Sequence, residues 1–155
     1  MGKSVWYEES MVIPLMIRWP GRIAPGSDNL LIGTADLTSS LLALTGHGDQ
    51  IPAEMQGKDY SPAFLGEVIE RPSSALYIES NPSWPEGGRR GVRTHRFTYV
   101  VERSKDGGEK EILHDNQEDP YQMANVVAEK IEIAAGLRGE MEGWLRETGD
   151  PWRLD

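Results

Sequence analysis

An apolar run from Met11 to Trp19, closed by Pro20 and Gly21, constrains the fold of this chain more than any other stretch. The run is rich in branched side chains and is too short for a membrane span, which needs about 20 residues. Such a run is typical of a strand that is covered on both faces, as in a parallel or mixed sheet. Pro14 argues against a central position, because proline has no N–H to donate to a neighbouring strand. The sequence therefore predicts a non-central strand at 11–19.

The segment just before this predicted strand carries polar and aromatic side chains. Lys3 is followed by the aromatic pair Trp6 and Tyr7 and by the carboxylates of Glu8 and Glu9. Open α/β sheets build their functional sites from loops beside strand ends. This segment is therefore the first candidate for a site.

A helix is expected further along, beginning near Thr34 or Asp36 and ending before Gly46. Leucines recur between these points at helical spacing, and glycine commonly follows a helix end. We expect this helix to pack on the sheet that holds the predicted strand. Asp36 has an alternative interpretation as a metal ligand, but its place at a helix start favours capping.

Short β segments dominate the chain after the breaker residues 71–74. Strands are predicted at 75–79, 91–94, 97–102 and 111–115. Residues 81–90 are expected to form a loop, and Asp106-Gly107-Gly108 predicts a tight turn. An amphipathic helix is predicted from about Val127 to Glu147. This part therefore predicts a four-stranded antiparallel sheet packed with a long C-terminal helix.

Composition and charge narrow the classes of partner. The chain has 155 residues, a formal net charge of −9 and no cysteine. The acidic balance argues against nucleic acid or an anionic membrane as partner. Since no disulfide indicates a compartment, cytoplasmic and periplasmic locations both stay open.

Five motifs follow one another along the chain. They are Gly2-Lys3-x-x-x-Tyr7-Glu8-Glu9-Ser10 with the apolar run after it, 34–46, 55–59, 91–99, and Leu113-His114-Asp115 with Asp119-Pro120. In this order they resemble the sulfatases of the alkaline-phosphatase superfamily, in the part that follows the metal site. Gln122, just after the last motif, stands where that family usually has Glu.

The resemblance implies an α+β fold in two parts. Residues 1–66 would form the C-terminal edge of the α/β catalytic core, of which a strand and a helix remain. Residues 67–155 would form the small subdomain of antiparallel sheet and helix.

The resemblance also implies a role for Lys3, because the lysine at this motif position in sulfatases contacts the sulfate group. A fixed ammonium there offsets the charge that builds on the sulfuryl oxygens and on the leaving oxygen. His114 stands where the family more often has Tyr, and we expect it to pack rather than to catalyse. Trp84, Arg89 and Arg90 lie in the expected loop 81–90 and are candidates for contact with the organic part of a substrate or its sulfate. The alternative for these three residues is a solvated loop.

The nucleophile of a sulfatase has no counterpart in this sequence. Sulfatases carry Cys/Ser-x-Pro-x-Arg, whose Cys or Ser becomes formylglycine, and hold a divalent cation, usually calcium, with aspartates and an Asn or His. The chain has no cysteine, and Ser83-Trp84-Pro85 lacks the Arg that the motif requires. We therefore expect no metal site here and no catalysis by the chain alone, as in a C-terminal portion that was cloned or that arose from a truncated reading frame.

Two alternatives stay open. The chain could belong to a related phosphonate or phosphodiester hydrolase, or it could be a non-catalytic oligomeric interaction domain. In an intact sulfatase the partner would be a sulfated small molecule or carbohydrate. For the chain alone, the strand at 11–19 would be exposed and would favour self-association.

Overall fold

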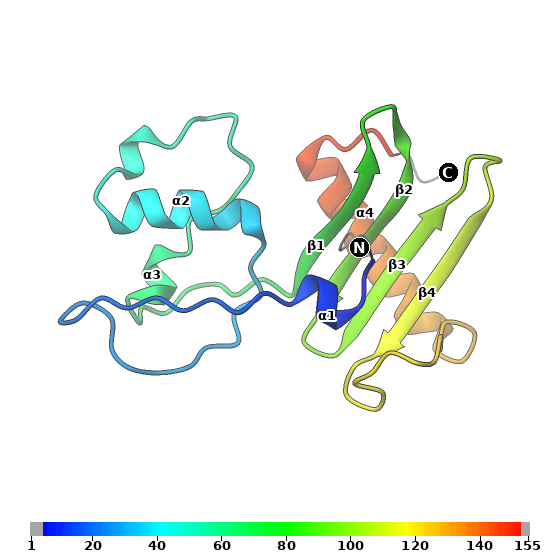
Figure 1. The fold of residues 1–155 in the computed structure, drawn as a ribbon, viewed down its shortest axis with the longest axis horizontal. Helices are drawn as coiled ribbons and strands as arrows, with labels where there is room; N and C mark the ends of the chain where they lie inside the picture. The colour runs from blue at the N-terminus through cyan, green and yellow to red at the C-terminus, as the bar shows by residue number, and fades with distance from the viewer. Residues whose placement is uncertain (1–4, 153–155) are drawn as a thin grey trace. The chain divides into compact units, whose positions relative to one another are not determined.

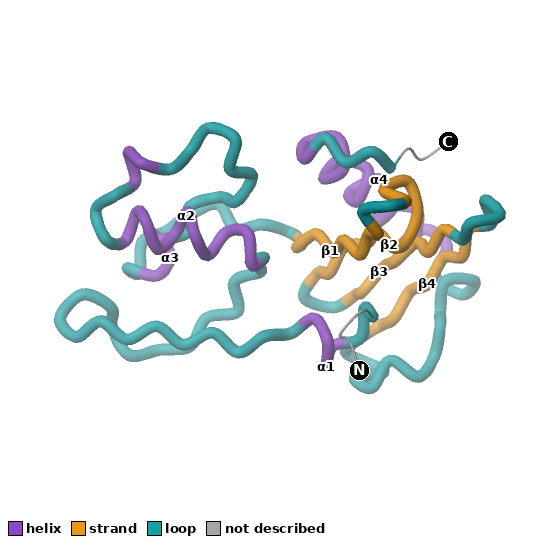
Figure 2. Tube along the Cα trace, turned by 45° about the horizontal axis from the view of Figure 1, so that its top comes forward, coloured by secondary structure: helices purple, strands orange, loops and turns teal. Residues whose placement is uncertain are grey.

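The computed structural model describes residues 5–152 and divides them into two compact units. Residues 5–13 and 74–152 form the first, which we name the sheet unit, and residues 14–73 form the second, the helix–loop unit. Figure 1 and Figure 2 show the elements of each. The domain boundary expected between residues 66 and 67 concerns a longer protein and stays a prediction.

The sheet unit is built on an antiparallel meander, which confirms the predicted sheet. Its strands are β1 (Ser74–Asn81), β2 (Trp84–Thr94), β3 (Phe97–Arg103) and β4 (Glu109–Asp115), in the spatial order β1-β2-β3-β4. The predicted turn joins β3 to β4, where Gly107 takes a φ of 86° that suits glycine. The expected loop at 81–90 is wrong, because β1 and β2 continue through it as a hairpin. Glu79 lies directly opposite Arg89 in that hairpin, and this charge pair stabilises it.

Helix α4 (Ile131–Thr148) covers one face of the sheet. Apolar side chains of the strands and of the helix form a single core there, made of Val92, Tyr99, Val101, Leu113, Ala134, Leu137, Met141, Leu145 and Trp152. The helix begins four residues later than predicted. The backbone N–H of Val126 donates instead to the carbonyl of Leu113, 2.9 Å away, so this stretch lines the edge of β4.

The opposite face of the sheet carries the beginning of the described chain. Helix α1 (Glu8–Met11) and Trp6 lie against Val100 and Ile112, whose side chains alternate with those that face α4. Figure 1 shows α1 and α4 on opposite sides of the strands. The sheet is therefore packed on both faces by segments that are far apart in the sequence.

The helix–loop unit contains α2 (Thr34–Leu44), the 3₁₀ turn η1 (Gly48–Gln50) and α3 (Ser61–Phe64). Asp36 binds two backbone N–H groups, that of Gly33 at 2.7 Å and that of Lys58 at 2.8 Å. The first bond caps α2 and the second ties the following loop to it. This arrangement is that of a capping residue, although the N-cap position itself is taken by Gly33.

The strand predicted at 11–19 is not formed. Residues 12–19 run without strand pairing, and several of their apolar side chains are exposed, Met16 to 92%. An extended segment becomes a strand only when a neighbour accepts and donates its hydrogen bonds, and none of the described residues does so.

Within residues 5–152, no helix is both long and apolar enough to cross a membrane.

Candidate functional site

The candidate site begins at Lys3, which lies outside the described residues. The segment that follows it, from Val5 to Met11, is described and is attached to the sheet unit. Trp6 is 8% exposed and packs against Val100 and Ile112. The contacts that hold residues 5–11 on the sheet unit are therefore described first.

A hydrogen bond between Trp6 and His114 makes the first attachment. The indole Nε1–H donates to Nε2 of His114 at 3.1 Å, and Nδ1 of His114 lies 2.8 Å from the carbonyl oxygen of Ala124. Because Nε2 accepts, Nδ1 carries the hydrogen and donates it to that carbonyl, which is the neutral form of the ring. His114 is buried, so the expectation that it packs is confirmed.

Glu8 makes two further attachments. Its carboxylate accepts from Arg93 Nε at 2.9 Å and from Arg93 Nη2 at 2.8 Å, a paired geometry that fixes direction as well as distance. Its backbone N–H donates to Oε1 of Gln122 at 2.8 Å. Glu8 thereby connects α1 both to β2 and to the segment after β4.

Gln122 has an unusual backbone for its residue type. Its φ is 53°, the left-handed region that non-glycine residues seldom adopt, and its side chain is buried. The side-chain Nε2 donates to Asn116 Oδ1 at 2.9 Å and to Thr98 Oγ1 at 3.2 Å. Together with the bond from Glu8, these contacts engage both ends of the Gln122 amide.

The three residues predicted to contact a substrate lie on β2, and the structure does not bring them to one point. Trp84 begins the strand, and its ring lies over Gly87. A Cβ at Gly87 would stand only 2.1 Å from Cζ2 of the Trp84 ring. Arg89 and Arg90 are adjacent and so face opposite sides of the sheet. Arg89 lies under Trp6, with its guanidinium carbon 5.1 Å from the ring centroid. Of the three, Arg89 contacts the segment that follows Lys3.

Arg89 is also paired with acidic side chains. It binds Glu79 at 2.8 Å and forms a second ion pair with Glu102. Burial by itself lowers the pKa of the guanidinium, but the hydrogen bond and charge of Glu102 and the charge of Glu79 outweigh it, so the pKa is raised. Arg89 therefore stays charged, with its charge offset by two carboxylates.

The side chain of Arg90 is fully used in contacts within the sheet unit. Its side chain is 1% exposed and binds Asp150 at 2.9 Å. Its remaining donors reach backbone carbonyls, those of Glu79, Pro85, Gly87 and Arg89. The guanidinium also stacks on Trp152 at 5.0 Å. Contact with a substrate would require these bonds to break, and substrate binding by the three residues stays a prediction.

The described residues do not fit the metal and nucleophile of a sulfatase. Within residues 5–152, no group of three or more His, Cys, Asp or Glu side chains is placed to hold a metal ion. The chain also has no cysteine from which formylglycine could be made. No catalytic step through a cation can be derived from these residues.

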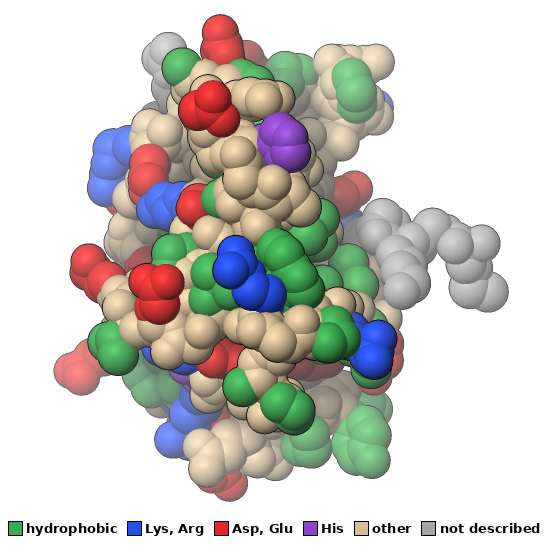
Figure 3. Space-filling view, turned by 90° about the vertical axis from the view of Figure 1, so that its left-hand side faces the viewer, with side chains coloured by type: hydrophobic (Ala, Val, Ile, Leu, Met, Phe, Trp, Pro, Cys, Tyr) green, Lys and Arg blue, Asp and Glu red, His purple; other side chains and the backbone are tan. Residues whose placement is uncertain are grey.

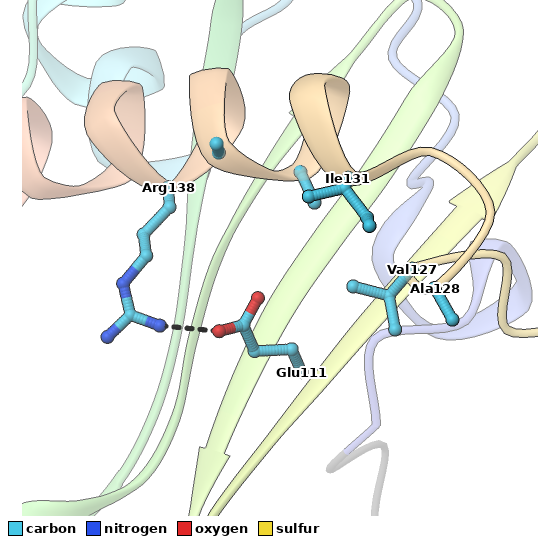
Figure 4. Close-up of a pocket in the computed structure, with 7 residues that line it drawn as sticks. Glu111, Val127, Ala128, Ile131 and Arg138 are labelled. Atoms are coloured by element: carbon cyan, nitrogen blue, oxygen red, sulfur yellow. Dashed lines mark hydrogen bonds and ion pairs between the residues drawn. The ribbon is translucent and has the colours of Figure 1, made fainter.

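A pocket of about 540 Å³ lies between β4 and the first turns of α4 (Figure 4). Its walls are mostly apolar, and its charged groups are Glu111 and Arg138, joined at 2.7 Å. Arg138 also lies 3.4 Å from Glu109 and 3.6 Å from Glu142. With three carboxylates around it, this arginine does not suit a sulfate ion.

One face of the helix–loop unit shows no gathering of a single kind of side chain. In Figure 3, which views this unit, apolar, acidic and basic side chains are interspersed. The attachments of residues 5–11 are thus the most specific feature near a predicted site residue. Sequence reasoning missed Arg93 and Gln122 as members of it, although Arg93 lies within the motif 91–99 and Gln122 lies two residues after Asp119-Pro120.

Comparison with known proteins identifies the family. The family of N-sulphoglucosamine sulphohydrolase C-terminal domains matches residues 1–147. An endo-4-O-sulfatase of Bacteroides thetaiotaomicron is 37% identical over 97% of this chain and 32% of its own length. An ulvan-active sulfatase of Formosa agariphila is 29% identical over 97% of this chain and 30% of its own length.

A solved structure also matches the fold of this chain. A putative sulfatase from Bacteroides fragilis superposes with a TM-score of 0.86 and 33% identity, over 95% of this chain and 32% of that protein. The chain thus spans about a third of the length of these relatives. It belongs to the family of N-sulphoglucosamine sulphohydrolase C-terminal domains and, with it, to the sulfatases of the alkaline-phosphatase superfamily.

Proposed function

We propose that this chain is the C-terminal part of a sulfuric ester hydrolase, supplies Lys3 to the sulfate-binding site, and does not catalyse by itself. The observation that carries the proposal is the family match over residues 1–147, which includes Lys3. Relatives named endo-4-O-sulfatase and ulvan-active sulfatase support a sulfated carbohydrate or other sulfated small molecule as substrate.

Electrostatics gives Lys3 its role. During cleavage of a sulfate ester, negative charge grows on the leaving oxygen, and a cation that is already in place lowers the barrier. Lysine suits this task as a compact charge with three donors. The formylglycine nucleophile and the divalent cation, with calcium as the expected metal, would come from polypeptide other than the described residues.

Absence of turnover by the chain alone is the first test. The purified chain is incubated with 4-nitrophenyl sulfate and calcium, and release of nitrophenol is followed. We expect a rate equal to the buffer blank, because the sequence contains no Cys/Ser-x-Pro-x-Arg. Turnover well above the blank would contradict the proposal.

A chimera tests the role of Lys3. The matching C-terminal third of the Bacteroides thetaiotaomicron endo-4-O-sulfatase is replaced by this chain, and kcat/KM is measured for wild type and Lys3→Ala. We expect an active wild-type chimera and a loss of about 100-fold or more in the variant, the range for removing one transition-state donor. Lys105→Ala, in the exposed β3–β4 turn, is the matched control and should be unchanged. A folded but inactive wild-type chimera, or a Lys3→Ala chimera as active as wild type, would contradict the proposal.

Self-association is a second candidate, favoured by the exposed apolar side chains of Val12, Ile13 and Met16. An unpaired apolar segment of this kind promotes pairing with another copy. Size-exclusion chromatography with light scattering tests it: a defined oligomer that Met16→Glu and Ile13→Glu convert to a monomer supports pairing through this segment. A monomeric wild-type chain would exclude it.

A further inference from the structure

We propose that His114 makes the attachment of residues 5–11 to the sheet unit depend on pH: the neutral ring holds Trp6, and the protonated ring releases it. This device goes beyond the proposed function, because it depends on contacts between described residues and not on the reaction that the complete protein catalyses. It is built from a buried ring whose two nitrogen atoms both have fixed partners.

The partners of His114 leave no place for a second hydrogen on the ring. The indole Nε1–H of Trp6 can only donate, so Nε2 of His114, 3.1 Å away, must accept. The carbonyl oxygen of Ala124 can only accept, so Nδ1 of His114, 2.8 Å away, must donate. A protonated imidazole donates from both nitrogens and accepts at neither. Protonation would therefore set two N–H groups against each other and break the bond to Trp6.

Burial prevents water from resolving this conflict while residues 5–11 stay in place. His114 is 4% exposed and Trp6 is 8% exposed. A buried donor without an acceptor loses its hydration and gains nothing in exchange, and a buried charge loses more. Detachment of residues 5–11 removes the opposing indole and opens Nε2 of His114 to water. The detached state is therefore the state that takes up the proton.

The neighbours of His114 do not supply a ready counter-charge. Thr98, which lies directly opposite on β3, is polar but uncharged. From residues 5–11, the ring of Tyr7 lies near His114, with the ring centroids 5.9 Å apart. The remaining titratable or charged side chains on the elements around His114 are Glu8, Glu9, Arg93 and Asp119.

These four side chains have other places or other partners. Glu8 and Arg93 are bound to each other at 2.8 Å, and Glu9 is exposed. Asp119 accepts from the backbone N–H of Ala124 at 2.8 Å. Ordinary carboxyl, phenol and guanidinium groups do not titrate between about pH 5.5 and 7.5, whereas an ordinary imidazole does. A change of the attachment over this interval therefore points to His114.

Proton linkage gives the direction of the effect. The attached state holds the ring neutral, whereas a solvated histidine takes up a proton below about pH 6.5. The detached state thus binds more protons as the pH falls, and each pH unit below about 6.5 favours detachment by up to about tenfold. The attachment is complete above that pH and weakens below it.

Nitrogen-15 NMR of the histidine rings in the full wild-type chain tests the starting geometry. At about pH 7.5 we expect the hydrogen of His114 on Nδ1, with Nε2 free of hydrogen and coupled across the hydrogen bond to the indole of Trp6. A hydrogen on Nε2, or a ring that is already protonated at this pH, would overturn the proposal.

Amide hydrogen exchange of the same chain tests the release. The protection factor is used because it divides out the pH dependence of the chemical exchange step. We expect the protection of the Glu8, Ser10 and Met11 amides to fall about tenfold between about pH 7.5 and 5.5, while the amides of β3 keep theirs. Constant protection of residues 5–11 over this interval would overturn the proposal.

Two variants assign the effect to one ring. His114→Gln cannot titrate, and its side-chain oxygen can accept from Trp6, so protection of residues 5–11 should change less than about twofold with pH. His95→Gln, in the exposed turn between β2 and β3, is the matched control and should show the wild-type fall. A wild-type fall in His114→Gln would overturn the proposal. If His114→Gln does not fold, the wild type decides: the ring signals of His114 and the protection must change over the same pH interval, and separate intervals would overturn the proposal.

Discussion

Asp150→Ala should destabilise the sheet unit by about 3 kcal/mol, because it leaves a buried guanidinium without its counter-charge. The side chains of Arg90 and Asp150 are 1% and 7% exposed and lie 2.9 Å apart. Removing one partner of a buried ion pair typically costs about 3–5 kcal/mol. Four backbone carbonyls and the ring of Trp152 also contact Arg90, and this partial compensation places the cost at the low end.

The measurement is urea unfolding of wild type, Asp150→Ala, Arg90→Met and the double variant, followed by far-ultraviolet circular dichroism. Arg90→Met keeps an unbranched apolar stem but removes the guanidinium and its charge. In the double variant no buried charge remains unpaired, so it should be more stable than the sum of the two single losses predicts. A loss below about 1 kcal/mol for Asp150→Ala, or strictly additive losses, would refute the reasoning, since removal of one partner alone is strongly destabilising.

Three further predictions test other parts of the structure. Gly57→Ala should destabilise the helix–loop unit by about 1–3 kcal/mol, measured as faster proteolysis of residues 14–73, because the new Cβ would stand 2.1 Å from the carbonyl oxygen of Ala35. Met141→Ala, in the fully buried core under α4, should cost about 2–5 kcal/mol in urea unfolding. The hydrogen bond from Arg96 lowers the pKa of Asp115 to about 2. Since a depressed carboxyl pKa stabilises the fold above its unfolded value, that contribution should be complete above about pH 4 and lost towards pH 2, and Asp115→Asn should remove this part of the acid dependence of urea unfolding.

The parts of the fold that could be predicted are those that local sequence determines. The strand at Phe97–Arg103 and the turn after it follow from β-branched and aromatic side chains and from Asp-Gly-Gly. The hairpin at 81–90 was missed because its glycines and prolines favour a loop. One of its supports, the pairing of Glu79 with Arg89, becomes visible only when the register is known.

The error at 11–19 has a different origin. An apolar run indicates burial, and burial can come from polypeptide that is not among the described residues. The chain spans about a third of its relatives, and within residues 5–152 no strand pairs with this run. The apolar pattern at 11–19 therefore predicted a buried strand that residues 5–152 do not form by themselves.

Part of the candidate site could likewise be predicted from a local motif, and part depends on contacts between distant residues. Lys3 was found through a motif, whereas the attachment of the described segment after it involves Gln122, which is 114 positions away from the Glu8 N–H that it binds. No spacing rule connects two residues at that distance. The positive φ of Gln122 is likewise a consequence of tertiary contacts, since glutamine alone does not favour it.

One consequence concerns how the sheet unit is assembled. Residues 5–13 belong to it although residues 14–73 separate them from the strands, so the long intervening segment must be closed before Trp6 can reach His114. Closing a long loop costs entropy but only slowly more as the loop lengthens, and the bonds of Trp6 and Glu8 must offset that cost. Each strand of the meander pairs with the strand next to it in sequence and needs no such closure. We therefore expect residues 5–11 to detach from the sheet unit before the strands unfold when Arg93 is changed.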